Sequence, residues 1–236
     1  MFIYQFYLSR IDVFLHLCYF IDITMELTRN FAVLEGGDGS GTTTQLSILK
    51  NKIKNTGKIP YFSTFEPTTG KTGELIRRAL KNEITINPRT LCYLFAADRN
   101  EHLYGQDGII NHVKNGEFVI CDRYVVSSLV YQGIECGDKL PESLNSFFPL
   151  PEITIFLDIK PEIAVERMKN RSSLEIYEVL EFQEKVYKKY ISVLEAYGKK
   201  GRVEIVDASK SVQEVADLVW GIIGQMPIFN HNENDL

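Results

Sequence analysis

Short apolar runs alternate with longer amphipathic stretches along most of the chain, beginning at Phe31. The runs are rich in β-branched and aromatic residues and contain few polar positions, as expected of strands that are buried on both faces of a sheet. We predict strands at residues 31–35, 60–65, 117–122, 152–158 and 202–207. The amphipathic stretches between them predict helices at residues 41–56, 72–82, 88–114, 124–136, 161–170, 175–198 and 211–224.

The order of these elements indicates the class of fold. Strands that alternate with helices form parallel sheets with right-handed crossovers, and the helices cover both faces. The prediction is therefore an α/β fold with a five-stranded parallel sheet, and 236 residues need only one such domain. Ligands of open parallel sheets bind beyond the carboxyl ends of the strands. Four predicted strands end there in a carboxylate, namely Glu35, Asp122, Asp158 and Asp207. For the last two we favour helix capping.

The first 24 residues are rich in aromatic and aliphatic side chains but fit neither of two familiar patterns. A spanning helix needs about 20 mostly apolar residues, and a signal peptide needs a basic start, an unbroken apolar run and a small-residue cleavage site. Here polar residues interrupt the run at Arg10, Asp12, His16 and Asp22. We expect residues 1–24 to be a disordered extension ahead of a natural start at Met25. A membrane-associating helix and a folded accessory segment are the alternatives. The domain then spans residues 25–226, and residues 227–236 form a disordered tail.

Charge and cysteine content narrow the class of partner. The net charge is −5 and the pI is about 5.5, whereas a nucleic-acid-binding surface is typically basic. The four cysteines show no CxxC pair and no metal-ligand spacing, which indicates reduced thiols in a cytoplasmic protein. We therefore expect no nucleic-acid partner and no membrane partner, and a small phosphorylated ligand stays compatible with these values.

A glycine-rich segment follows the first predicted strand directly and opens a helix, which is the context of a phosphate-binding P-loop. Closely spaced glycines let successive backbone N–H groups point at one anion, and the helix N-terminus adds its positive end. Thr43 stands where such loops carry a hydroxyl that binds Mg²⁺. A glycine-rich turn without a ligand is the alternative. We assign nucleotide binding to Gly36, Gly37, Asp38, Gly39, Ser40, Gly41, Thr42, Thr43 and Thr44.

One position of this loop departs from the usual pattern GxxxxGK[ST], because Thr42 replaces the lysine. That lysine reaches the outer phosphates of ATP and stabilises charge during phosphoryl transfer. Loss of one such donor costs roughly 2.7–4 kcal/mol, or 10²–10³ in rate, whereas binding through the backbone amides is less affected. Two interpretations stay open: another cation compensates, or the protein binds nucleotide and turns it over slowly.

The glycine-rich loop and three further segments together carry a resemblance to a known family. LEGGDGSGTTTQ (34–45), FEPTTGKTGELIRRAL (65–80), LFAADRNEHL (94–103) and DRYVVSSLVYQG (122–133) occur in the order and at the spacing of thymidylate kinases. The chain resembles this family over residues 27–225. The resemblance implies a three-layer P-loop NTPase fold with a lid, and phosphoryl transfer from ATP to dTMP with Mg²⁺. Another pyrimidine nucleotide as acceptor is the rival substrate. Two copies commonly associate in the family, so homodimer formation is a further expectation.

The residues of these segments suit the same chemistry. Asp122 can hold Mg²⁺, and Arg123 offers a planar fork to a phosphate, with a structural ion pair as its alternative. Phe95 and Arg99 share one helix face at i and i+4, so the ring can stack on a pyrimidine while Arg99 bonds its edge. Core packing is the alternative for Phe95. The resemblance implies that Ser127, Ser128, Tyr131 and Gln132 lie against base and sugar, that Asp38 and Glu66 lie near the acceptor sugar and metal, and that Arg77 holds the acceptor phosphate. A solvated helix charge is the alternative for Arg77.

The resemblance also implies a mobile lid at residues 166–182. Members with glycine at the position of Gly39 normally carry catalytic arginines in that lid. The usual arginine of its DR-x-E element is missing here, and Phe65 replaces an arginine common before Glu66. Arg171 is therefore the lid residue that we predict to close over ATP, with Lys169 as the alternative.

Overall fold

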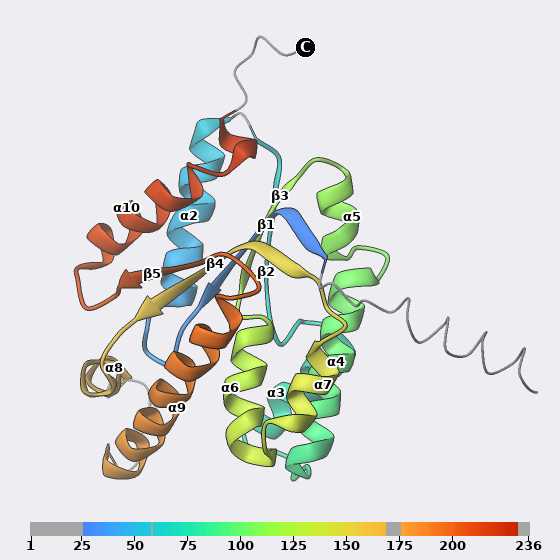
Figure 1. Ribbon diagram of the computed structural model, residues 1–236, viewed down its shortest axis with the longest axis vertical. Helices are drawn as coiled ribbons and strands as arrows, with labels where there is room; N and C mark the ends of the chain where they lie inside the picture. Colours follow the sequence, from blue (N-terminus) through green and yellow to red (C-terminus); the bar gives the residue numbers. More distant parts are fainter. Residues whose placement is uncertain (1–25, 58, 169–175, 231–236) are drawn as a thin grey trace, which may run out of the picture.

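The computed structural model of the protein describes residues 26–57, 59–168 and 176–230. Five parallel strands form one sheet in the order β2-β3-β1-β4-β5 (Figure 1). The strands are β1 (Leu27–Glu35), β2 (Tyr61–Phe65), β3 (Phe118–Asp122), β4 (Leu150–Asp158) and β5 (Val203–Asp207). This confirms the predicted α/β fold with a five-stranded parallel sheet.

Helices cover both faces of the sheet (Figure 1). They are α2 (Thr42–Thr56), α3 (Lys71–Leu80), α4 (Pro88–Tyr104), α5 (Ile109–Lys114), α6 (Val125–Cys136), α7 (Lys139–Asn145), α8 (Pro161–Met168), α9 (Ile176–Tyr197) and α10 (Val212–Ile223). Alternate residues of the central strand β1 enter different cores, because successive side chains point to opposite faces of a sheet. Ala32 and Leu34 pack with α2 and α10, whereas Phe31 and Val33 pack with α4, α6 and α9.

The strand order places one crevice at the centre of the sheet. The chain leaves β1 for β2 on one side, and after β3 it crosses to β4 on the other side of β1. Ligands of open α/β sheets bind where the order reverses in this way. The carboxyl ends of β1, β3 and β2 therefore meet beside α6 and α9, and the candidate site lies there.

The predicted helix at 88–114 is wrong, because the structure has two helices there, α4 and α5. Gly105 ends α4, and a Cβ atom at this position would lie 2.6 Å from the carbonyl oxygen of Glu101. The backbone N–H of Gly108 then bonds the Gly105 carbonyl oxygen at 3.0 Å, which makes the tight turn that opens α5. Helix α7 was not predicted, because seven residues with a proline in the first turn show little periodicity.

The first residues after α10 pack against the domain, at the start of the segment predicted as a tail. Pro227–Phe229 form a short 3₁₀ turn, and the Phe229 ring makes edge contacts with Phe118 and Trp220 at centroid distances of 5.0 and 5.7 Å. Apolar residues near the chain end thus complete the core under α2 and α10. The predicted extension at 1–24 and the rest of the tail from residue 231 lie outside the described residues.

The carboxylate at the end of β5 differs from its predicted role as a helix cap. Asp207 accepts bonds from the backbone N–H and hydroxyl of Ser209, while α10 itself is capped by Ser211 together with Glu214. Asp207 therefore closes a turn before the helix and is not its cap. Across residues 26–57, 59–168 and 176–230, no helix is both long and apolar enough to cross a membrane.

Candidate active site

The phosphate loop joins the central strand β1 to α2 and has the backbone conformation that its glycines predict. Gly39 and Gly41 have φ values of 82° and 95°, a region that L side chains rarely adopt. The Ser40 N–H bonds the Gly37 carbonyl oxygen at 3.1 Å and closes the turn. The loop leads directly into the first turn of α2, and the backbone N–H groups of such a turn can bind an anion.

The buried carboxylate of Glu35, at the end of β1, holds the start of this loop in place. Glu35 is fully buried, and its Oε1 accepts bonds from the backbone N–H groups of Tyr124 (2.9 Å) and Ser127 (3.1 Å). Its Oε2 accepts a bond from the Ser127 hydroxyl at 2.5 Å. Glu35 therefore connects the loop to the first turn of α6. Burial raises the pKa of Glu35 above 4.5, although the bonds from Ser127 and the charge of Arg123 oppose this shift.

The raised pKa of Glu35 predicts a pH dependence of stability. The folded protein binds the Glu35 proton more tightly than the unfolded chain, so the contribution of Glu35 is complete below pH 4.5 and is lost as the pH rises through the folded pKa. We expect wild type to gain stability relative to Glu35→Gln as the pH is lowered through this window, by about 1.4 kcal/mol per unit of pKa difference. Urea unfolding of both proteins between pH 5 and 8 measures this. A difference that stays constant with pH would contradict the prediction.

The two residues predicted to hold Mg²⁺ lie together. The Thr43 hydroxyl donates to Asp122 Oδ2 at 2.7 Å. The other carboxylate oxygen of Asp122, Oδ1, is buried and has no hydrogen-bond partner among the described residues. Within those residues, no group of three or more His, Cys, Asp or Glu side chains could hold a metal ion. One carboxylate and one hydroxyl beside a phosphate loop match the few protein ligands that Mg²⁺ uses next to substrate phosphates.

Arg123 connects the phosphate loop to the neighbouring helices. Its Nη2 donates to Asp38 Oδ1 at 2.8 Å, and its guanidinium carbon lies 5.3 Å from the centre of the Tyr131 ring. Burial alone lowers the pKa of Arg123, but the nearby Tyr131, Tyr190 and Asp38 groups outweigh it, and the pKa lies above its ordinary value. The side chain keeps 22% of its surface exposed, so a charged fork beside the loop stays accessible to an anion.

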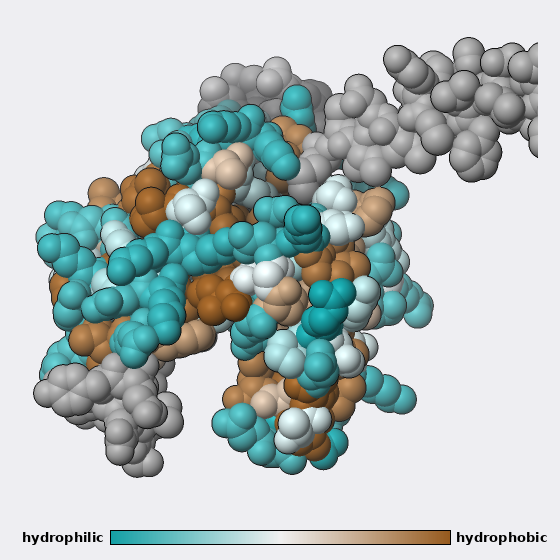
Figure 2. Space-filling model, turned by 60° about the horizontal axis from the view of Figure 1, so that its bottom comes forward, coloured by the Kyte–Doolittle hydropathy of each residue, from teal (hydrophilic) through white to brown (hydrophobic). Residues whose placement is uncertain are grey.

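A cavity of about 390 Å³ opens beside Arg123, and its size is within the range of small-molecule sites. Figure 2, which brings the lower side of Figure 1 forward, shows a deep notch in this face of the molecule. Nine predicted substrate residues line the cavity, namely Asp38, Glu66, Phe95, Arg99, Arg123, Ser127, Ser128, Tyr131 and Gln132. They come from the loop, from the positions directly after β2 and β3, and from α4 and α6. Gln132 Oε1 is buried and has no hydrogen-bond partner in the described part of the chain.

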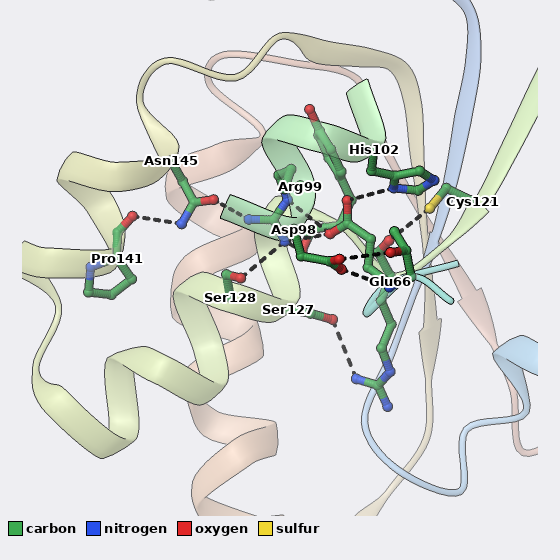
Figure 3. A network of polar contacts seen from close by, with 12 residues as sticks. Glu66, Asp98, Arg99, His102, Cys121, Ser127, Ser128, Pro141 and Asn145 are labelled. Atoms are coloured by element: carbon green, nitrogen blue, oxygen red, sulfur yellow. Dashed lines mark hydrogen bonds and ion pairs between the residues drawn. The ribbon is translucent and has the colours of Figure 1, made fainter. Parts of the chain in front are cut away.

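Arg99 lies at the inner wall of this cavity and is almost fully buried (Figure 3). Its Nε and Nη2 donate to Glu66 Oε2 at 2.9 and 2.6 Å. Burial alone lowers the pKa of Arg99, but the Glu66 carboxylate outweighs it and the pKa lies above its ordinary value. A charged guanidinium, paired with Glu66, is therefore held in place at the wall of the cavity.

Comparison with known proteins agrees with this geometry. A family model described as thymidylate kinase matches residues 34–219. The chain belongs to the thymidylate kinase family. A Treponema pallidum relative is 43% identical over 170 residues, which cover 72% of this chain and 81% of the relative. A Clostridium novyi relative is 34% identical over 204 residues, covering 82% and 97%, and one from Ligilactobacillus salivarius is 35% identical over 207 residues, covering 82% and 96%. The names of all three include thymidylate kinase.

One predicted substrate residue of this thymidylate kinase family member is not brought into the cavity. Arg77 is absent from its lining, because its Nη1 donates to the carbonyl oxygens of Pro67 and Thr68. Arg77 thus supports the backbone beside Glu66. Arg171 belongs to residues 169–175 of the predicted lid, which lie outside the described residues.

Three residues that the sequence did not predict support the cavity wall of this thymidylate kinase family member. Asp98 accepts bonds from the backbone N–H and hydroxyl of Thr68, both at 2.7 Å. His102 contacts Glu66, and Asn145 contacts Arg99. His102 could have been found, because it lies three residues after Arg99 on the same helix face. Asn145 had no such signal, because α7 was not predicted.

Proposed function

We propose that this protein is a nucleoside monophosphate kinase that transfers the γ-phosphoryl group of ATP to dTMP and yields ADP and dTDP. Membership of the thymidylate kinase family supports the proposal. One observation carries the proposal. The same cavity is lined by the phosphate loop and by residues of α4 and α6, and the guanidinium of Arg123 lies between them. Such an arrangement suits two phosphorylated ligands that meet end to end.

The acceptor nucleotide occupies the cavity in this proposal. The pyrimidine ring stacks on Phe95 and its edge meets Arg99, Ser128 and Gln132, all of which line the pocket. Tyr131 lies beside the sugar, where its ring leaves little room for a ribose 2′-hydroxyl. Asp38 accepts from the 3′-hydroxyl of the acceptor while it holds Arg123. The acceptor phosphate then points towards the loop.

ATP is the donor in this proposal, and its phosphates lie on the backbone N–H groups of the loop and of the first turn of α2. Thr43 and Asp122 would hold Mg²⁺, since a hydroxyl and an unpartnered buried carboxylate oxygen lie side by side there. A bound Mg²⁺ neutralises part of the charge on the donor phosphates. The lid residue Arg171 stays a prediction as a second cation over ATP.

The reaction needs alignment more than a base, because the acceptor phosphate oxygen is already anionic. The chain contributes by orienting both nucleotides and by neutralising charge on the moving phosphoryl group. Arg123 serves both purposes, because its planar fork can bond two phosphate oxygens at once. Closure of the lid would exclude water, which otherwise competes as acceptor.

A coupled assay of ADP release tests the proposal with the full chain, Mg·ATP and three acceptors measured side by side. We expect turnover with dTMP to exceed turnover with dUMP and with CMP. The second candidate function is a nucleotide-binding protein whose chemistry has decayed, and Thr42 in the lysine position favours it. Stabilisation against heat by Mg·ATP and dTMP without ADP release would decide for that candidate.

The variant Thr42→Lys tests the effect of the missing ammonium on the rate. Among the described residues, Arg123 is the one arginine or lysine that makes an ion pair with a loop residue. We expect the variant to raise kcat by about tenfold to a hundredfold, because it adds one preorganised donor at the outer phosphates. The KM for ATP should change little, since the backbone amides still bind the phosphates. A wild-type kcat would show that another cation already supplies this charge.

A further inference from the structure

A buried histidine stands behind the residues that line the cavity. His102 lies in α4 and does not line the cavity itself, yet it is 8% exposed and has a polar partner at each ring nitrogen. Its Nδ1 is 3.0 Å from Glu66 Oε1, and its Nε2 is 2.6 Å from the Thr64 hydroxyl. Figure 3 shows its ring directed at Glu66 from the side opposite Asn145.

The partners of His102 determine which ring nitrogen carries the proton. An ionised carboxylate can only accept, so Nδ1 must donate to Glu66. In the neutral ring Nε2 is then an acceptor, and the Thr64 hydroxyl donates to it. The bonds therefore run in one direction, from Thr64 through His102 to Glu66.

Each oxygen of the Glu66 carboxylate has its own partner as a result. Oε1 accepts from His102, and Oε2 accepts from both Nε and Nη2 of Arg99. The backbone N–H of Glu66 bonds the Asp122 carbonyl oxygen at 3.0 Å. With both its backbone and its carboxylate fixed, Glu66 holds the plane of the Arg99 guanidinium in one orientation.

The remaining donors of Arg99 can be counted. Nη2 also lies 3.1 Å from the Tyr124 carbonyl oxygen and 3.1 Å from the Ser128 hydroxyl, so its two hydrogens have acceptors. Nη1 donates to Asn145 Oδ1, and the Asn145 amide in turn donates to the Pro141 carbonyl oxygen at 2.8 Å. A guanidinium has five N–H donors. One Nη1 hydrogen is therefore left without an acceptor in the described part of the chain, on a side chain that lines the cavity.

We propose that His102 is a positioning residue for recognition of the base, because it fixes Glu66 so that Arg99 presents its one free N–H to a keto oxygen at C4 of the pyrimidine. The inference rests on the proposed function for the place of the base. A donor in this position accepts thymine and uracil, which carry a C4 keto oxygen. It disfavours cytosine, whose C4 amino group is itself a donor. His102 thus controls the choice between keto and amino pyrimidines without touching either.

Two substitutions at position 102 separate this role from simple packing. His102→Asn places an amide nitrogen near the position of Nδ1 and keeps the bond to Glu66. His102→Gln reaches the position of Nε2 and keeps only the bond to Thr64. Both remove the ring, so packing is lost in both. The measurement is calorimetric binding of dTMP and dCMP to the full chain, together with ATP affinity and Tm as controls.

We expect His102→Gln to bind dTMP about tenfold to a hundredfold more weakly, as for loss of a bond to a charged group, with dCMP affinity little changed. The preference for dTMP over dCMP then falls by the same factor. His102→Asn should keep the preference for dTMP over dCMP within about threefold of wild type. The affinity for ATP should be unchanged in both variants. If the Gln variant does not fold, Thr64→Val tests the same chain of bonds from its outer end and should also lower the preference.

Other outcomes overturn the inference. If His102→Gln keeps the wild-type preference for dTMP over dCMP, the bond from His102 is not needed to position Glu66. If both variants lose this preference equally, the His102 ring acts by packing. Binding is measured without turnover, so the outcome is separable from the proposed function. Suppose that the wild-type protein binds dTMP more tightly than dCMP, that His102→Gln removes this difference, and that no ADP is released. That result would contradict only the proposed kinase activity.

Discussion

Replacement of Arg123 by alanine is expected to lower kcat by about 10²–10³, the usual effect of removing one preorganised donor from a charge-transfer site. Arg123 is the residue whose fork lies between loop and cavity, held by Asp38 at 2.8 Å. Because Thr42 replaces the loop lysine, Arg123 is the one arginine or lysine of the described residues that makes an ion pair with the loop. The KM for dTMP should rise less than kcat falls, since the base contacts do not involve Arg123.

Arg123→Lys should recover only part of this loss. Lysine keeps the charge but not the planar fork that bonds two phosphate oxygens at once. Arg202→Ala is the matched control, because Arg202 is exposed and its one ion pair among the described residues is with Glu204, two residues away, at 3.0 Å. Steady-state kinetics of the three variants with dTMP and ATP measure the effect. Wild-type kcat in Arg123→Ala would remove Arg123 from the reaction and leave its bond to Asp38 as a structural ion pair.

Gly73→Ala is expected to have the largest effect on stability. A Cβ atom at Gly73 would overlap the carbonyl group of Thr68. Thr68 cannot move aside easily, because Asp98 holds both its N–H and its hydroxyl at 2.7 Å. Overpacking of this kind costs typically 1–3 kcal/mol, which lowers Tm by roughly 2–12 °C in a domain of this size. The KM for dTMP should also rise, because Pro67 next to Thr68 lines the cavity.

Gly221→Ala is the control for this substitution. Gly221 also lies within a helix, α10, but a Cβ atom there meets no atom within 4 Å. Alanine is the better helix former by roughly 0.8–1.0 kcal/mol, so this variant should be slightly more stable than wild type and equally active. Thermal unfolding monitored by circular dichroism compares the two. Equal Tm values for both variants would contradict the argument from the Thr68 contact.

The sequence alone determined the parts of this protein that depend on near neighbours. The phosphate loop could be read from Gly36–Thr43, because the backbone conformations that seat an anion depend on glycines within a few residues. The five strands and most helices followed from local periodicity for the same reason. Where a single residue changed the local path, as Gly105 does at the end of α4, periodicity carried the predicted helix too far.

Only the tertiary structure decided which polar groups meet across long separations. Arg123 meets Asp38 at a separation of 85 residues, His102 meets Glu66 at 36, and Asn145 meets Arg99 at 46. Resemblance to a family indicated that Arg99 and Glu66 matter, but not that they bond each other or that α7 supplies a second hold. Such contacts depend on how helices pack against one sheet, and no pattern within a single segment records that packing. Arg77 is an example. Its motif assigned it to the acceptor phosphate, whereas in the structure it donates to the backbone carbonyl oxygens of Pro67 and Thr68.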